Sequence, residues 1–332
     1  MTTSEYFKSL LDNINLKMKD EERQLIEDKQ NSLRESLNEI LPLEDDFLTG
    51  SYARHTIIKP KGANDKFDVD VFVAFSNDDY GEAELAELHK LVVSALEDIK
   101  VNKPKLGITK INTSQRRSVG VEFGNNFQVD IVPAIEIEKG NLYKIFDKRT
   151  LKPLRSNPKI HGELLSKANE RTGQMLVSII KILKSWRRNK CDYVKSFHLE
   201  LLATEVIGSK KIESYTQRLV DFFVNGHPKL KTACLKDPAN PKGDSYVDAY
   251  LDDDGTRQKL LNLVSVEAQI AKLAMELEKE GRLDEAVEEW EKIFSDDFSN
   301  NENASDNNVN LPPRPAPGPH TPPMPPRRRE VG

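Results

Sequence analysis

Residues 50–56 read Gly-Ser-Tyr-Ala-Arg-His-Thr, and residues 68–75 read Asp-Val-Asp-Val-Phe-Val-Ala-Phe. The second stretch alternates, and this pattern predicts a strand whose valines and Phe75 lie on a buried face. Side chains two positions apart on a strand point to the same side, so Asp68 and Asp70 project together away from that apolar face. The Gly-Ser pair of the first stretch falls where a strand would pass into a helix. Backbone N–H groups and a hydroxyl at such a place can bind triphosphate oxygens.

A third carboxylate lies in a later pair of alternating runs. Residues 118–123 and 127–132 are separated by Gly-Asn-Asn, which predicts a β-hairpin. Asp130 falls on the face of the second arm that is opposite its apolar residues. If this arm lies beside the first strand, the three carboxylates converge. Such a group, without a nearby histidine or cysteine, forms a hard oxygen site suited to Mg²⁺ or Mn²⁺. Metals held there can activate an attacking hydroxyl and stabilise a pyrophosphate leaving group.

The pattern along the chain divides it into four segments. Residues 1–42 are predicted to be helical, with one long helix, and residues 43–158 form a mixed α/β core that holds the carboxylates. Residues 159–298 are mostly helical. Residues 299–332 are rich in Asn, Asp, Ser and Pro and are expected to be disordered, because they cannot bury enough apolar surface to offset their ordering entropy. The expected fold class is therefore α+β, a mixed sheet with helices joined to a helical lobe.

The composition narrows the class of protein. The 332 residues are 37% hydrophobic and 31% charged, with a net charge of -5 and two cysteines. No apolar run approaches the ~20 residues that span a bilayer. Two cysteines are too few for a disulfide scaffold or a structural zinc site, and they favour a cytoplasmic location. The negative charge argues against a protein that mainly coats nucleic acid. An enzyme or a switch without a membrane segment is expected.

The spacing of a Gly-Ser pair, a D-x-D pair and a third strand aspartate resembles the signature of the DNA polymerase β-like nucleotidyltransferase superfamily. The residues that match are Gly50, Ser51, Asp68, Asp70 and Asp130. The resemblance implies a polymerase β-like catalytic lobe in which the Gly-Ser pair contacts the triphosphate. It also implies that Asp68 and Asp70 hold both metals, while Asp130 helps to bind one and acts on the attacking ribose hydroxyl.

The helical segment adds to the resemblance. Residues 179–186 are similar to the helix that carries a triphosphate-binding lysine in the oligoadenylate synthetase and poly(A) polymerase branch. Residues 195–202 are similar to the helix start that follows it. By this match, Lys184 and Ser196 would contact phosphates and Phe197 would stack on a base.

Plainer interpretations of these residues remain open at this point. Trp186 is most simply a core aromatic, Phe197 fits a core position equally well, and Lys184 could be a surface lysine. The histidines form no triad or metal spacing and are expected to be structural or exposed. Residues 237–241 resemble the D-P-x-x-P element of the same branch, but no contact is assigned to them.

Within the superfamily the chain most resembles the bacterial CD-NTases, the cyclic GMP-AMP synthase/DncV-like nucleotidyltransferases of CBASS antiphage systems, over roughly residues 5–298. This implies a Mg²⁺-dependent enzyme that joins ATP, alone or with other nucleoside triphosphates, into a cyclic oligonucleotide second messenger and releases pyrophosphate. The product would activate a separate effector during phage infection. Two other functions fit the residues: a terminal nucleotidyltransferase or AMP-transferring enzyme acting on RNA or protein, and a non-catalytic nucleotide sensor.

The last segment ends in Gly332 and holds nine prolines in residues 312–332. Some CBASS systems encode a ubiquitin-like conjugating enzyme that links the C-terminal residue of the synthase to a target. The resemblance therefore implies that Gly332 is a conjugation site. The alternative is a tail that only solubilises the protein or attracts nucleic acid.

Overall fold

The computed structural model of the protein describes residues 1–294, apart from residues 17–19, 62–66, 82–83, 125–126, 141, 241–245 and 254. The tail and its predicted disorder lie outside the described residues. The helices and strands follow one another in this order: α1 (Thr3–Ile14), α2 (Asp20–Ile40), β1 (Leu43–Thr49), α3 (Gly50–Ala53), β2 (Phe67–Ser76), α4 (Leu85–Asn102), β3 (Ile108–Asn112), β4 (Val119–Phe123), β5 (Phe127–Glu138), β6 (Leu142–Asp147), β7 (Lys152–Ser156), α5 (Pro158–Arg171), α6 (Leu176–Lys190), α7 (Ser196–Ile207), α8 (Tyr215–Lys229), α9 (Thr256–Lys279) and α10 (Leu283–Phe294).

The strands form one seven-stranded sheet in the order β1-β2-β5-β4-β3, with β6 pairing β5 and β7 pairing β6. Strands β2 and β5 are parallel, and the other pairs are antiparallel. The two alternating runs that predicted a hairpin are β4 and β5, and their antiparallel pairing confirms that prediction. The two turn residues between them, Asn125 and Asn126, lie outside the described residues.

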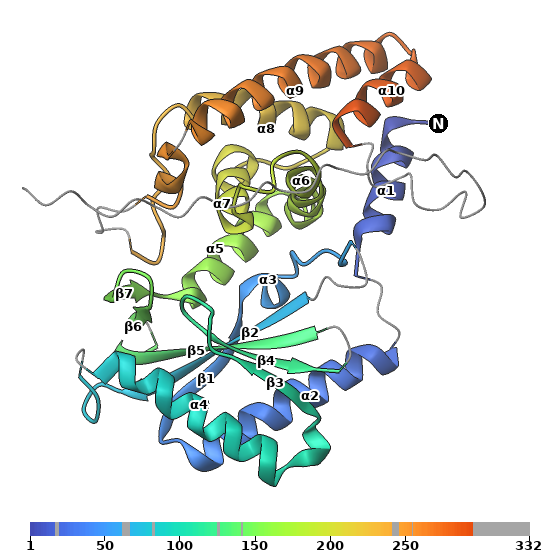
Figure 1. Ribbon diagram of the computed structural model, residues 1–332. Helices are drawn as coiled ribbons and strands as arrows, with labels where there is room; N and C mark the ends of the chain where they lie inside the picture. The colour runs from blue at the N-terminus through green and yellow to red at the C-terminus, as the bar shows by residue number, and fades with distance from the viewer. Residues whose placement is uncertain are drawn as a thin grey trace, which may run out of the picture. The chain divides into compact units, whose positions relative to one another are not determined.

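Helices α2 and α4 cover one face of the sheet (Figure 1). Alternate apolar side chains of β2, β4 and β5 point to this face and are buried against the two helices, whereas Phe72, Ala74 and Ala134 lie in a separate small cluster with side chains of β6. In β2 the side chains buried against the two helices are the valines and Phe75 that the alternation predicted. The carboxylate side chains of β2 and β5 therefore lie on the other face of the sheet, which leaves them free to face the remaining helices.

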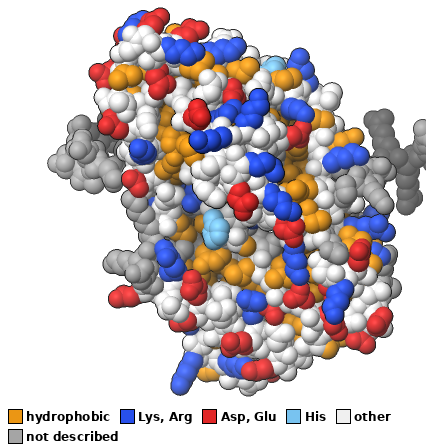
Figure 2. All heavy atoms as spheres, turned by 180° about the vertical axis from the view of Figure 1, so that it is seen from behind, with side chains coloured by type: hydrophobic (Ala, Val, Ile, Leu, Met, Phe, Trp, Pro, Cys, Tyr) orange, Lys and Arg blue, Asp and Glu red, His pale blue; other side chains and the backbone are white. Residues whose placement is uncertain are grey.

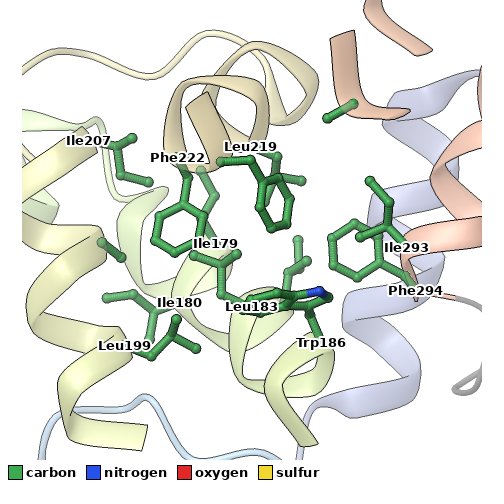
Figure 3. Close-up of a cluster of buried hydrophobic side chains, with 14 of the residues drawn as sticks. Ile179, Ile180, Leu183, Trp186, Leu199, Ile207, Leu219, Phe222, Ile293 and Phe294 are labelled. Carbon is green, nitrogen blue, oxygen red and sulfur yellow. The ribbon is translucent and has the colours of Figure 1, made fainter. Parts of the chain in front are cut away.

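The helices that follow the sheet have a separate core built around α6 (Figure 3). Trp186 on α6 is 1% exposed and its ring meets Phe223 edge-on, so the core interpretation of this tryptophan is confirmed. Helix α1 packs into the same core, where Phe7 contacts Trp290 with ring centroids 5.1 Å apart. The two helices of the first segment thus belong to different cores, α1 to the helical one and α2 to that of the sheet.

On the face of the molecule that Figure 2 shows, basic and acidic side chains are interspersed, with apolar side chains between them. In the described part of the chain, no helix combines the length and the apolarity needed to cross a bilayer.

Candidate active site

The parallel pairing of β2 and β5 brings the predicted carboxylates together. In its register Asp70 lies opposite Asp130, and Asp68 lies opposite Gln128. Because residues two apart on a strand share a face, all three carboxylates lie on the side of the sheet away from α2 and α4. The expectation that the Asp130 arm lies beside the Asp68 strand is confirmed.

These carboxylates repel one another and are largely buried from solvent. Burial raises the pKa of Asp70 to about 7, and the charges of Asp130 and Asp68 add to the effect. Burial also raises the pKa of Asp130 to about 6, although a hydrogen bond from Gln115 lowers it. A divalent cation would relieve this repulsion, and an all-oxygen donor set is what Mg²⁺ prefers. The chemistry of these residues therefore fits the expected metal. In the described part of the chain, however, no three acidic, histidine or cysteine side chains are already placed close enough together to coordinate one ion.

Two glutamine side chains hold Asp130. Gln115 Nε2 donates to both carboxylate oxygens, at 2.9 and 3.0 Å, and Gln128 Nε2 donates to Oδ1 at 3.2 Å. The Ser118 hydroxyl donates to Gln115 Oε1 at 2.8 Å, which fixes the orientation of the Gln115 amide. Sequence reasoning missed Gln115, because it lies in the loop before β4. One signal was available: Gly120 is a glycine inside a strand, and a Cβ there would lie only 3.1 Å from Gln115 Nε2.

Gly50 stands directly against the carboxylate of Asp70. Strand β1 pairs with β2 so that Thr49 lies opposite Asp70, and the next residue turns the chain into the short helix α3. Gly50 has φ +70°, and a Cβ on it would lie 1.7 Å from Asp70 Oδ2. This position requires glycine, both for its backbone conformation and for its closeness to the carboxylate.

A cleft of about 450 Å³ lies between the sheet and the helical lobe. Seven of the eight residues predicted from the sequence line it: Gly50, Ser51, Asp68 and Asp70 on the sheet side, and Lys184, Ser196 and Phe197 on the helical side. Asp130 does not line the cleft but lies beside Asp70 on the neighbouring strand. The structure thus brings together, around one cavity, residues that are nearly 150 positions apart in the sequence.

Lys184 is 4% exposed, so the interpretation of it as a surface lysine is wrong. Its Nζ donates to the carbonyl oxygen of Thr56 at 3.1 Å and to the Thr56 hydroxyl at 2.9 Å. It also forms an ion pair of 2.5 Å with Glu200 Oε1. A lysine ammonium has three N–H donors, and all three have partners here.

Glu200 on α7 joins three parts of the molecule. Besides Lys184, it accepts a hydrogen bond from Arg54 Nε at 2.9 Å and another from the Thr56 hydroxyl at 3.0 Å. Burial raises the pKa of Glu200, but the charges of Lys184 and Arg54 outweigh burial and hold the pKa below its usual range. Sequence reasoning assigned no role to Arg54, Thr56 or Glu200, although all three lie inside the two stretches that it singled out.

Phe197 forms part of the cleft wall next to this network. Its half-buried ring lies 4.6 Å from the ring of His161, and the Arg54 guanidinium lies 5.5 Å from its centroid. His161 in turn contacts Asp237 at 2.6 Å, which places the D-P-x-x-P element behind Phe197. The ring is therefore held from two sides.

Comparison with known proteins identifies the family. Residues 1–169 match the family model described as the Second Messenger Oligonucleotide or Dinucleotide Synthetase domain. A probable cyclic nucleotide synthase from Bacillus cereus (strain VD146) is 25% identical over an alignment of 280 positions that covers 76% of this chain and 82% of that protein. The CBASS oligonucleotide cyclase CdnC from Escherichia coli (strain KTE188) is 28% identical over 178 residues, 53% of this chain and 55% of that protein.

Among solved structures, Escherichia coli MS115-1 CdnC with ATP superposes with a TM-score of 0.67 at 20% identity, covering 90% of this chain and 99% of that one. This likeness confirms the predicted α+β fold, a mixed sheet with helices joined to a helical lobe. The resemblance to the CD-NTases is confirmed by the family match together with the relatives. Because the family model covers half of its length, the chain belongs to the Second Messenger Oligonucleotide or Dinucleotide Synthetase family.

Proposed function

We propose that this nucleotidyltransferase joins nucleoside triphosphates into its cyclic second messenger in the cleft above β2 and β5. Asp68 and Asp70 hold Mg²⁺, and Asp130 helps to hold it and takes the proton of the attacking ribose hydroxyl. The observation that carries the proposal is the parallel register that sets Asp70 beside Asp130 on the face open to the helical lobe. When bound, Mg²⁺ supplies charge stabilisation to the phosphates and to the pyrophosphate leaving group.

The remaining predicted residues divide the substrate between them. The Gly-Ser pair offers its backbone N–H groups and the Ser51 hydroxyl to the triphosphate oxygens. Ser196 offers a second hydroxyl from the opposite wall. Lys184 contributes positive charge to the same cleft as the two serines, and Phe197 offers a ring on which a base can stack.

The names of the relatives suggest the substrate and the setting. A structural neighbour was solved with ATP, and a relative is named a CBASS oligonucleotide cyclase. We therefore propose ATP as one substrate, a cytoplasmic location for the protein, and a product that activates a separate effector in antiphage defence.

The purified protein, incubated with Mg²⁺ and labelled triphosphates but without an acceptor, tests this function. The expected result is a phosphatase-resistant product, whose bases and size mass spectrometry then identifies. The Asp68→Asn/Asp70→Asn variant is the control and should form none. Transfer of label only after RNA or protein is added would assign the enzyme to the terminal or AMP-transferring class.

Conjugation through Gly332 is a separate proposal, because that residue lies outside the described residues. Deleting Val331 and Gly332 should leave synthesis by the purified enzyme intact. In cells that carry the native operon, the deletion should abolish any covalent adduct of higher mass. Adducts that persist after the deletion would contradict the proposal.

A further inference from the structure

Two cations that line the cleft, Lys184 on α6 and Arg54 directly after α3, both pair with Glu200 but differ in what they can still bind. Each of the three N–H donors of Lys184 already has a protein partner, so a phosphate can contact this ammonium only by displacing Thr56 or Glu200. Lys184 therefore acts on a phosphate mainly through its charge.

Arg54 has donors to spare. Its Nε donates to Glu200, and within the described part of the chain no hydrogen bond engages its two terminal nitrogens. The side chain is 10% exposed and lines the cleft together with Asp68 and Asp70. A guanidinium presents a planar fork that matches two phosphate oxygens at once.

The charges of this cluster do not balance. Glu200 supplies one negative charge against the two positive charges of Lys184 and Arg54, and all three side chains are at most 10% exposed. Glu200 pairs with both cations but neutralises only one of their two charges, and Asp70, the other acidic group that interacts with Arg54, would be taken up by Mg²⁺ under the proposed function. The cluster therefore favours an incoming anion. A triphosphate in the cleft would supply that anion.

Glu200 also fixes where Arg54 points. It holds Nε from one side, while the ring of Phe197 lies against the guanidinium from another. An amide at position 200 would keep the shape of the side chain, but it could not accept from Lys184, Thr56 and Arg54 together without turning its NH₂ toward one of them. Ionised Glu200 is therefore needed to keep the network in one arrangement.

We propose that Arg54 binds the phosphates of the nucleotide directly, and that Glu200 is the positioning residue that aims it. This rests on the proposed function of the cleft. Arg54 directly follows α3, so its fork would approach the phosphates from the same segment as Gly50 and Ser51, at the point where its side chain meets Glu200 of α7. Losing the fork should therefore weaken every ligand that carries phosphates and leave ligands without them unaffected.

Three ligands measured on the same protein test this: inorganic tripolyphosphate, ATP and adenosine, each titrated in the presence of Mg²⁺. Arg54→Lys and Arg54→Ala should weaken tripolyphosphate and ATP by about 10- to 100-fold, the range expected for hydrogen bonds to a charged group. Adenosine binding should change less than about twofold. Glu200→Gln should weaken tripolyphosphate and raise the KM for ATP, although it makes the cleft more positive.

Arg34→Lys is the matched control, because Arg34 also pairs with a carboxylate through Nε, at Asp46, outside the cleft. It should bind all three ligands like the wild type. Equal binding of tripolyphosphate by the wild type and both Arg54 variants would overturn the inference. Tighter binding by Glu200→Gln would show that Glu200 competes with phosphate rather than aiming Arg54. If the wild type bound neither ATP nor tripolyphosphate, the proposed function itself would fail.

Discussion

Replacing Gly50 with alanine should abolish most catalysis at a small cost in stability. Two effects act at this position. The backbone has φ +70°, where a residue with a Cβ costs about 1–2 kcal/mol. The added Cβ would also lie 1.7 Å from Asp70 Oδ2, whereas ordinary van der Waals contact begins at 3.4 Å. The carboxylate must therefore move by more than an ångström. Because a misplacement of about 1 Å can cost ~100-fold in rate, kcat/KM should fall at least that far.

Gly281→Ala separates the two effects. Gly281 has φ +79° in the turn between α9 and α10, and a Cβ there would meet nothing within 4 Å. Gly281→Ala should lose about 1–2 kcal/mol of unfolding free energy, or a few degrees of Tm, from the backbone strain alone. Gly50→Ala should lose somewhat more, because the Asp70 carboxylate must also move, and only this variant should lose activity. Thermal unfolding and product formation from labelled ATP measure the two quantities. If Gly50→Ala kept more than a tenth of wild-type activity, the working enzyme would not hold Asp70 against residue 50.

The other predictions concern the carboxylates and a buried histidine. Asp70→Asn should raise Tm without metal, because it removes a charge from a repelling group, and Mg²⁺ should raise the Tm of the wild type but not of this variant. If Mg²⁺ did not change the Tm of the wild type, this result would contradict the proposed metal site. Gln115→Ala should lower kcat about tenfold with little change in KM, because it removes the hydrogen bonds that orient Asp130 and does not touch the nucleotide. A change in KM alone, measured by steady-state kinetics, would contradict this role of Gln115. Burial lowers the pKa of His198 to about 4, below its ordinary 6.5, so the unfolded chain binds a proton that the folded one does not. This histidine should therefore cost stability as the pH drops from 6.5 toward 4, by up to about 3 kcal/mol. Because the raised pKa values of Asp70 and Asp130 act in the opposite direction over the same range, the cost is measured as the difference between the wild type and His198→Gln in urea titrations, and an equal pH dependence of the two proteins would contradict it.

The sheet and the carboxylates could be predicted because their signals are local. Alternation over 68–75 and 127–132 fixes which side chains are buried, and the same alternation puts the aspartates on the other face. To predict that Asp70 and Asp130 lie close together, it was then enough to assume that the two strands are neighbours in the sheet. The D-x-D spacing and the Gly-Ser pair then limited the chemistry to phosphate and metal.

The polar partners could not be predicted in the same way. Gln115 reaches Asp130 from a loop, and Glu200 reaches Arg54 across 146 positions of sequence. Neither contact leaves a periodic pattern. Lys184 shows the limit most clearly: the motif indicated its place in the cleft, but only the structure shows that Thr56 and Glu200 take up all of its donors.

The contact between α1 and α10 has a consequence for synthesis on the ribosome. Phe7 of α1 packs against Trp290 and Phe294 of α10, so the core around α6 is complete only when α10 has been synthesised. At a translation rate of about 5–20 residues per second, the chain carries its aspartates for many seconds before that closure. The helices that bear Lys184 and Glu200 therefore gain their full packing only after α10 has been synthesised and has met α1.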